Sequence, residues 1–137
     1  MAKIAALDLG DQWTGIALSD SSKLLAKPYT TTSTDQLYQT LDTLFAQEDI
    51  DTVILGYPKT MRGTISDQTR KIIAMKEDLE KHYTTKSWIL WDERLSSKRA
   101  ESMSKLKTKE DKIKLHARAA AFILDSYLTF LIYHKEQ

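Results

Sequence analysis

The sequence predicts an α/β fold in which five strands form one mixed sheet flanked by helices. Three strand-like segments follow one another within the first 29 residues, with only short turns between them, which favours antiparallel neighbours. Later in the chain, two apolar runs are separated by segments with helical periodicity, and parallel strands require helical crossovers of this kind. We therefore expect three antiparallel strands followed by two parallel ones.

The N-terminal region is expected to form a hairpin and a third strand. Apolar residues dominate 3–9 and 14–20, and the segment 10–13 (GDQW) between them is typical of a short turn. Residues 23–29 (KLLAKPY) predict the third strand. We expect Pro28 to end it, because proline lacks the amide hydrogen that a strand ladder uses.

The middle of the chain predicts a helix and then a buried strand. Residues 32–49 begin with a Ser/Thr cap signal and repeat leucine at helical spacing, at Leu37, Leu41 and Leu44. The continuous apolar run at 51–58 is closed by glycine and proline, which is typical of a strand buried on both faces.

The second half of the chain repeats this alternation. An amphipathic pattern predicts a helix at 66–83, and a second apolar run that ends in acids predicts a strand at 86–94. After these come a short capped helix at 96–106, a charged loop at 107–112 and a long final helix at 113–135.

Length and composition indicate one soluble domain spanning residues 1–137. The chain contains no cysteine, which excludes disulfides, thiolate metal sites and cysteine nucleophiles and fits a reducing compartment. The longest apolar stretch, 119–133, contains Asp125 and is shorter than a bilayer span, so no membrane segment is expected. These features predict a cytoplasmic protein.

The net charge of +1 conceals a basic segment. Residues 94–118 hold nine Lys or Arg and three acidic residues, whereas acids are in excess in residues 1–93. A basic segment suits a polyanion such as nucleic acid, but lysine-rich solvated surfaces are common in soluble proteins. Charge alone favours the ordinary surface interpretation.

Acidic side chains stand at the ends of two predicted strands. Asp8 ends the first strand, and Asp92 and Glu93 end the fifth. Sites in open α/β sheets form at the carboxyl ends of strands, so these acids are expected to approach one another. Neighbouring carboxylates repel unless a cation lies between them, and Mg²⁺ or Mn²⁺ prefers oxygen ligands of this type. The pair Asp8 and Glu93 therefore suits metal-assisted phosphodiester cleavage.

The turn after Asp8 has two interpretations. Gly10 would let the backbone turn sharply and would admit a ligand closely. The alternative is structural: Asp8 and Asp11 are ordinary turn residues, and Asp92 caps the helix that follows it. The motif DLGD taken alone supports both equally.

Four collinear motifs give the chain a resemblance to a known family. They are LDLGDQWTGIALSD (7–20), VILGYPKTMRGTISDQTRKI (53–72), WDERLSSKRAE (91–101) and AAAFILDSYL (119–128). Together they resemble the YqgF/RuvX family, which is described as Holliday junction resolvases and pre-16S rRNA nucleases. The resemblance implies a ribonuclease H-like fold, a divalent-metal-dependent nuclease activity and a role in ribosomal RNA maturation. It places the first catalytic acid on Asp8 and the second on Asp92 or Glu93, of which we favour Glu93.

The chain departs from the family pattern at two places. Gln12, Trp13 and Thr14 stand where the family usually has a basic pair, which removes an expected phosphate contact. The third acid of the family, near the start of the last helix, falls on His116. Its imidazole could bind a metal, act as a general base or position water, with weaker Mg²⁺ binding and more tolerance for Mn²⁺.

Helical geometry predicts where His116 points. Ala120, Ile123, Tyr127 and Phe130 lie near its direction at 100° per residue, so His116 should stand at the top of the stripe that faces the sheet. Asp125 falls on the opposite side and cannot replace the missing acid. The structural alternative is a histidine satisfied by a backbone carbonyl at a helix start.

The resemblance also supplies candidate nucleic-acid contacts around this site. They lie in the loop after the fourth strand, directly after Glu93 and in the basic segment, although Ser96 could simply cap a helix. The set comprises Lys59, Arg62, Thr64, Arg94, Ser96, Lys98, Arg99, Lys105, Lys107 and Lys109.

The favoured function is a Mg²⁺- or Mn²⁺-dependent nuclease that processes the 5′ end of pre-16S rRNA in association with ribosome assembly. One alternative is a catalytically weakened nucleic-acid-binding factor, and another is a Holliday junction resolvase acting on branched DNA. Junction resolution would need two active sites and hence a homodimer. The first motif also resembles the phosphate loop of actin-like and sugar-kinase ATPases. Those enzymes bind nucleotide between two lobes, each built on a ribonuclease H-like core. This chain supplies one such core, so ATP binding is not expected.

Overall fold

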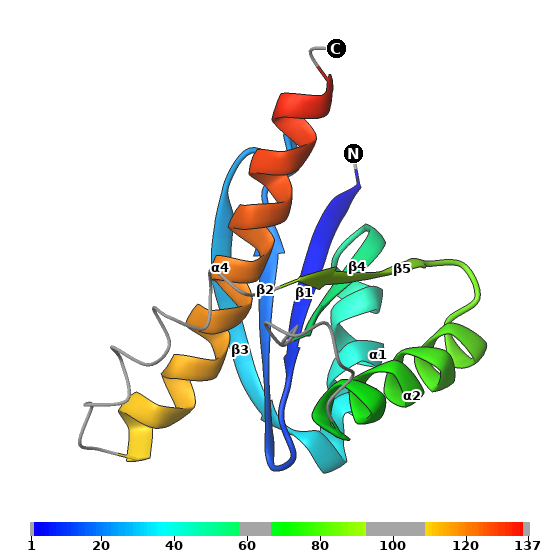
Figure 1. The fold of residues 1–137 in the computed structure, drawn as a ribbon, viewed down its shortest axis with the longest axis vertical. Coiled ribbons are helices and arrows are strands. Elements are labelled where there is room, and N and C mark those ends of the chain that lie inside the picture. Colours follow the sequence, from blue (N-terminus) through cyan, green and yellow to red (C-terminus); the bar gives the residue numbers. More distant parts are fainter. Residues whose placement is uncertain (1, 58–66, 93–108, 136–137) are drawn as a thin grey trace.

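The protein is built on one five-stranded mixed sheet (Figure 1). This computed structural model describes residues 2–57, 67–92 and 109–135. The strands are β1 (Lys3–Leu9), β2 (Trp13–Ser19), β3 (Ala26–Ser33), β4 (Ile50–Tyr57) and β5 (Ser87–Asp92). They lie in the order β3-β2-β1-β4-β5; β2 is antiparallel to β1 and β3, and β4 is parallel to β1 and β5. The predicted fold class is confirmed.

Helices cover both faces of the sheet. The helical elements are a 3₁₀ turn η1 (Thr34–Gln36), α1 (Leu37–Gln47), α2 (Asp67–His82) and α4 (Lys109–Lys135). α1 and α2 pack on one face, and α4 crosses the other face (Figure 1). The alternation of side chains along each strand therefore divides the buried residues into two layers.

The layer under α1 and α2 contains every second residue of β1, including Leu7 and Leu9. The layer under α4 contains the other residues of β1, Ile4 and Ala6, packed against helix residues such as Ala120. Alternate side chains of a strand point to the same face, so Asp8 shares the face of Ile4 and Ala6, which is the face that α4 covers.

The third strand begins and ends later than the sequence predicted, at Ala26–Ser33 instead of 23–29. β3 continues through Pro28 to Ser33. Pro28 faces Ala17 and Thr30 faces Ile16, so one residue, Tyr29, is inserted between neighbouring pairs. Proline is tolerated in edge strands and at such irregularities because the ladder is already interrupted there. The expectation that Pro28 ends the strand is wrong for this reason.

The last helix also begins earlier than predicted. α4 starts at Lys109, so it takes in most of the segment 107–112 that was expected to be a charged loop. Lysine and glutamate have high helix propensity, and a charged segment can therefore extend a helix that is held by packing further along.

α4 is long and apolar enough, by length and composition alone, to cross a membrane over Lys114–His134. The expectation that no segment of the chain is long enough to span a membrane is therefore wrong as regards length. In this fold Ala120, Ile123 and Leu124 of the same stretch are fully buried against the sheet. The apolar character of α4 is accounted for by its position as a core helix.

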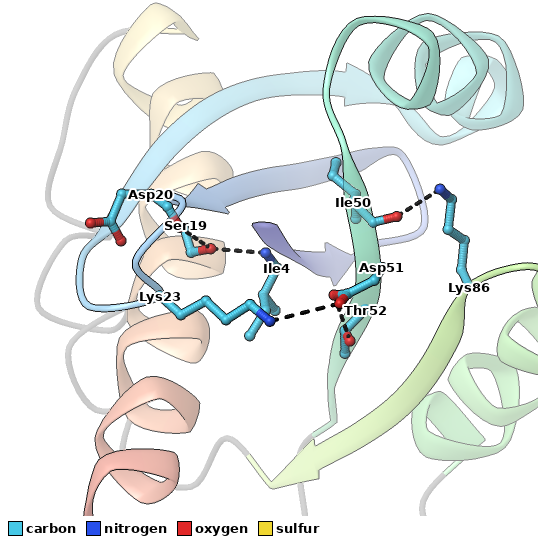
Figure 2. Close-up of polar contacts among 8 residues, drawn as sticks. All are labelled: Ile4, Ser19, Asp20, Lys23, Ile50, Asp51, Thr52 and Lys86. Atoms are coloured by element: carbon cyan, nitrogen blue, oxygen red, sulfur yellow. Dashed lines mark hydrogen bonds and ion pairs between the residues drawn. The ribbon is translucent and has the colours of Figure 1, made fainter. Parts of the chain in front are cut away.

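Polar contacts fasten the end of the sheet at which β1 begins (Figure 2). The backbone amide of Ile4 donates to Ser19 Oγ at 2.8 Å, and the Ser19 side chain is buried. Nearby, Lys86 Nζ donates to the carbonyl oxygen of Ile50 at 2.6 Å. These contacts connect β1 to β2 and the start of β4 to the start of β5.

Asp20 closes the turn between β2 and β3 at this same end. Its carboxylate accepts hydrogen bonds from the Ser22 hydroxyl and from the amides of Leu24, at 2.8 Å, and Leu25, at 3.0 Å. The Ser22 hydroxyl and these two amides lower the pKa of Asp20 to about 2. Lys23 adopts a left-handed conformation, with φ of 60°, within the turn.

Candidate functional site

The candidate site lies at the other end of the sheet, where β1 ends. Asp8 occupies the α4 face of β1 and is paired across the ladder with Gly15 of β2. The layer beneath it, at Ala6, is fully buried, whereas the Asp8 side chain is 23% exposed. Asp8 is therefore the point at which the buried face of β1 becomes accessible to solvent.

Gly15 brings α4 into direct contact with the sheet at this position. A Cβ atom added to Gly15 would lie 1.8 Å from the carbonyl oxygen of His116 and 2.7 Å from the backbone nitrogen of Ala117. No side chain fits in that space, so the backbones of β2 and α4 touch there. The sequence did carry a signal for this contact, because a glycine inside an apolar strand often marks close backbone approach, but the sequence interpretation missed it.

His116 is thereby placed beside Asp8. The imidazole Nδ1 lies 3.9 Å from Asp8 Oδ2, and the two side chains are 32% and 23% exposed. This separation is too long for a direct hydrogen bond but permits an ion pair when the imidazole is protonated. The predicted orientation of His116 toward the sheet agrees with this geometry, and Asp125 is exposed on another side of the helix.

The turn after Asp8 is held in place from two sides. A Cβ atom on Gly10 would lie 2.5 Å from the carbonyl oxygen of Trp13, so the turn requires glycine at this position. Thr34 of η1 donates its hydroxyl to the Gly10 carbonyl at 2.7 Å, and its amide donates to the Gln12 carbonyl at 2.9 Å. Thr34 is a positioning residue that the sequence interpretation did not single out.

A pocket of about 340 Å³ lies on the other side of this turn. The ion pair between Lys71 and Asp11, 3.5 Å long and largely exposed, crosses part of it. Such an exposed pair contributes little to stability. The lining residues are Leu9, Gly10, Asp11, Thr34, Gln68, Lys71, Ile72 and Met75.

The register of β5 places Asp92 on the face of the sheet opposite Asp8. Asp92 is paired with Tyr57, which packs in the layer under α1 and α2, so Asp92 has the parity of the face opposite Asp8. Trp91, one residue earlier, packs in the layer under α4. Asp92 thus stands close to the end of the sheet at which Asp8 lies, but on the other face.

The remaining predicted site residues lie outside the part of the chain that the structure describes, or have no described side chain. Among the side chains that the structure describes, in residues 2–57, 67–92 and 114–134, no three His, Asp or Glu gather into a metal-binding group. Of the predicted catalytic set, the structure brings together Asp8 and His116. Those not described are Lys59, Arg62, Thr64, Glu93, Arg94, Ser96, Lys98, Arg99, Lys105 and Lys107, together with the side chain of Lys109.

The fold defines the structural class of the protein, which is ribonuclease H-like. T. thermophilus RuvC in complex with a Holliday junction substrate aligns with a TM-score of 0.57 and 11% identity, over 95% of this chain and 96% of that one. The fowlpox virus Holliday junction resolvase gives a TM-score of 0.51 and 19% identity, over 94% and 99%. Similarity at these identities establishes the fold.

The sequence identifies the family within that class. Residues 2–129 match the family described as "RuvX: Holliday junction resolvase", and the chain belongs to this family. A Caldicellulosiruptor saccharolyticus protein named "Putative pre-16S rRNA nuclease" is 34% identical over 139 aligned positions, covering 94% of this chain and 98% of its own. A Rubrobacter xylanophilus protein of the same name is 36% identical over 96 positions, covering 70% and 69%. The chain is therefore a member of a nuclease family, and its enzyme class is hydrolase.

Proposed function

We propose that this protein is a divalent-metal-dependent nuclease that trims the 5′ end of pre-16S rRNA during ribosome assembly in the cytoplasm. The observation that carries the proposal is the meeting of Asp8 and His116 at the end of β1. The two relatives that are 34% and 36% identical to this chain are each named "Putative pre-16S rRNA nuclease", which supports RNA as the substrate.

The donor atoms of Asp8 and His116 fit a shared divalent ion. Metal–ligand distances of about 2.0–2.3 Å allow two ligands of one ion to stand up to about 4.5 Å apart. The Nδ1–Oδ2 separation of 3.9 Å falls within that limit. Such an ion would activate a water molecule and stabilise the leaving oxygen of the cleaved phosphodiester. Asp8 and His116 would hold it, and the Gly10 turn would leave one side open for the substrate.

Glu93 is the acid we propose as the partner of Asp8. Neighbouring side chains in a strand point to opposite faces. Trp91 packs on the face that Asp8 occupies, so Asp92 points to the opposite face, which argues against Asp92 as the partner. Glu93 itself lies outside the described residues, and we propose it because the family resemblance offers Asp92 or Glu93 as the second acid. Asp92 could act on the ion only from the other face of the sheet.

The imidazole of His116 sets the proposed metal preference. Replacing a carboxylate with a neutral imidazole lowers the negative charge of the site, which weakens binding of the hard Mg²⁺ ion more than that of Mn²⁺. We expect higher activity with Mn²⁺ than with Mg²⁺ at equal concentration.

The test is cleavage of a structured RNA that contains the 5′ end of 16S rRNA and its precursor sequence. Asp8→Asn is expected to reduce the rate about 10³-fold or more, because the site loses a charged ligand. Asp11→Asn is a matched control, since Asp11 is an exposed acid in the same turn, and it should cut at nearly the wild-type rate. Both variants should unfold at the wild-type midpoint.

Three results would overturn the proposal. Equal cleavage by wild type and Asp8→Asn would remove Asp8 from the reaction. RNA binding without cleavage in either metal would favour a catalytically weakened binding factor. Cleavage of a four-way DNA junction by a homodimer, with no cleavage of the RNA, would favour the resolvase function that the family description gives.

His116→Asp tests the metal preference separately. This variant restores the carboxylate and is expected to raise Mg²⁺-dependent cleavage relative to Mn²⁺-dependent cleavage. An unchanged ratio of the two rates would show that His116 does not contact the ion.

A further inference from the structure

The outer edge of β3 separates two grooves. Within the described part of the chain, β3 is paired only with β2 and so forms an edge of the sheet. A groove of about 450 Å³ lies between β3 and α4, and one of about 610 Å³ lies between β3 and the η1–α1 segment. Tyr29 and Thr30 line both grooves. Tyr29 is the residue inserted at the β3 irregularity and is 41% exposed, and because it lines both grooves it lies on the ridge between them.

The groove beside α4 is basic. Lys114 and Arg118 line it together with uncharged residues, and its described lining includes no acid. Both side chains are exposed, and neither forms an ion pair within the described residues. Like charges four residues apart on a helix repel each other slightly, so placing Lys114 and Arg118 side by side does not stabilise α4. They are also separated by about 6 Å along the helix axis, which suits an extended polyanion.

The groove beside α1 has a different chemistry. Its described lining contains no charged residue and consists of amide, hydroxyl and aromatic groups. Gln36 and Gln39 are exposed there, and each amide offers both donors and an acceptor. Such groups can hydrogen-bond the edges of bases but give no attraction to phosphate. The lining residues are Tyr29, Thr30, Gln36, Gln39, Thr40 and Thr43.

We propose that a single-stranded part of the nucleic-acid substrate crosses the β3 edge. Its phosphates lie along Lys114 and Arg118, a base stacks on Tyr29, and the base edges face Gln36 and Gln39. This surface holds the substrate away from the cleaved bond, and the inference rests on the proposed nuclease function.

α4 connects this surface to the candidate active site. Lys114 and Arg118 are each two residues from His116, which places them about 200° around the helix from it. His116 therefore faces Asp8 on one flank of α4, while the two cations face β3 on the other. An acidic peptide would also complement two cations. The aromatic ridge and the amide-lined groove favour a nucleic-acid strand instead, because every base has a stacking face and polar edges.

The main experiment measures binding of a single-stranded RNA as a function of salt. The double variant Lys114→Ala/Arg118→Ala removes two cations from the groove. Its plot of log K against log salt should become shallower by about 1.4, which corresponds to about 25-fold weaker binding at 0.1 M salt. The matched control is Lys76→Ala/Lys81→Ala on α2, which makes the same charge change on the other face of the sheet and should leave the slope nearly unchanged.

Tyr29 tests the stacking contact. Tyr29→Ala is expected to weaken RNA binding at least about fivefold with no change of the salt slope, whereas Tyr29→Phe should bind like wild type. Because Tyr29 is exposed, neither change should impair folding.

Several outcomes would overturn the inference. One is an unchanged slope in Lys114→Ala/Arg118→Ala, and another is an equal reduction in the α2 control. Loss of binding to a polyglutamate peptide, with RNA binding retained, would assign the groove to an acidic partner. Asp8→Asn separates this inference from the proposed function: it should bind the RNA with the wild-type affinity and salt slope but should not cut it. Full activity of Asp8→Asn would overturn the active site while leaving the binding result intact.

Discussion

The two ends of the sheet are built in opposite ways. At the end where β1 begins, buried polar groups are paired at hydrogen-bond distance, as between Ile4 and Ser19 (Figure 2). At the end where β1 stops, Asp8 meets His116 at 3.9 Å, and this is its one polar contact among the described residues. The paired polar groups at the first end stabilise the fold, and the Asp8 carboxylate at the second end remains partly exposed. The same strands therefore end in paired polar groups at one end of the sheet and in the candidate site at the other.

Gly15→Ala is expected to have the largest effect on this comparison, because it disturbs both the packing of α4 and the candidate site. The new Cβ would lie 1.8 Å from the His116 carbonyl, so α4 must move away from β2. We expect a loss of about 3 kcal/mol or more in the free energy of unfolding, together with a fall in cleavage as His116 leaves Asp8. Urea unfolding and RNA cleavage would measure the two effects. Wild-type stability would show that α4 does not rest on Gly15.

Ser19→Ala should affect only the polar end. It leaves the Ile4 amide buried without its partner, which costs about 1–3 kcal/mol. Cleavage by the remaining folded protein should be unchanged, because Ser19 lies at the far end of the sheet from Asp8. A change of cleavage without a change of stability would contradict the division of roles between the two ends.

Asp20 adds a pH dependence to the polar end. Its pKa falls from 3.8 in the unfolded chain to about 2 in the folded protein, so the folded state favours the ionised carboxylate. Its contribution to stability is complete above pH 3.8 and is lost as the pH falls toward 2. The stability difference between wild type and Asp20→Asn should therefore shrink across this interval. A difference that stayed constant would show that ionisation of Asp20 is not linked to folding.

The smallest effect is expected at Lys3. Its Nζ lies 2.9 Å from Glu48 Oε2, and both side chains are about one-third exposed. Lys3→Ala should cost about 0.2–1 kcal/mol, less at high salt. A loss as large as that of Ser19→Ala would show that this ion pair, too, is an essential part of the polar end.

The elements of the fold were predictable where local pattern and burial agree. The apolar runs that became β1, β2, β4 and β5 are long enough to be recognised without a partner. β3 was placed but cut short at Pro28, because its position at the sheet edge is a tertiary property. The early start of α4 has a similar cause, since packing further along the helix allows a charged segment to join it.

The candidate site was predictable in part. Helical periodicity was enough to aim His116 at the sheet, whereas Asp8 was selected by its place at a strand end together with the family resemblance. The contact that joins them depends on Gly15, whose importance arises only when a helix 100 residues later in the chain lies against it. Thr34 was missed for the same reason, because its hydroxyl acts on a turn that is distant in sequence.

The contact between Gly15 and α4 has a consequence for folding during synthesis of the chain. Asp8 belongs to the first strand, whereas His116 belongs to a helix that follows all five strands in the chain. During synthesis, the hairpin can form long before α4 emerges, but the pair cannot exist until that helix has docked. A partly made chain would therefore be unable to cut the RNA around it, and nuclease activity would begin only when folding is almost finished.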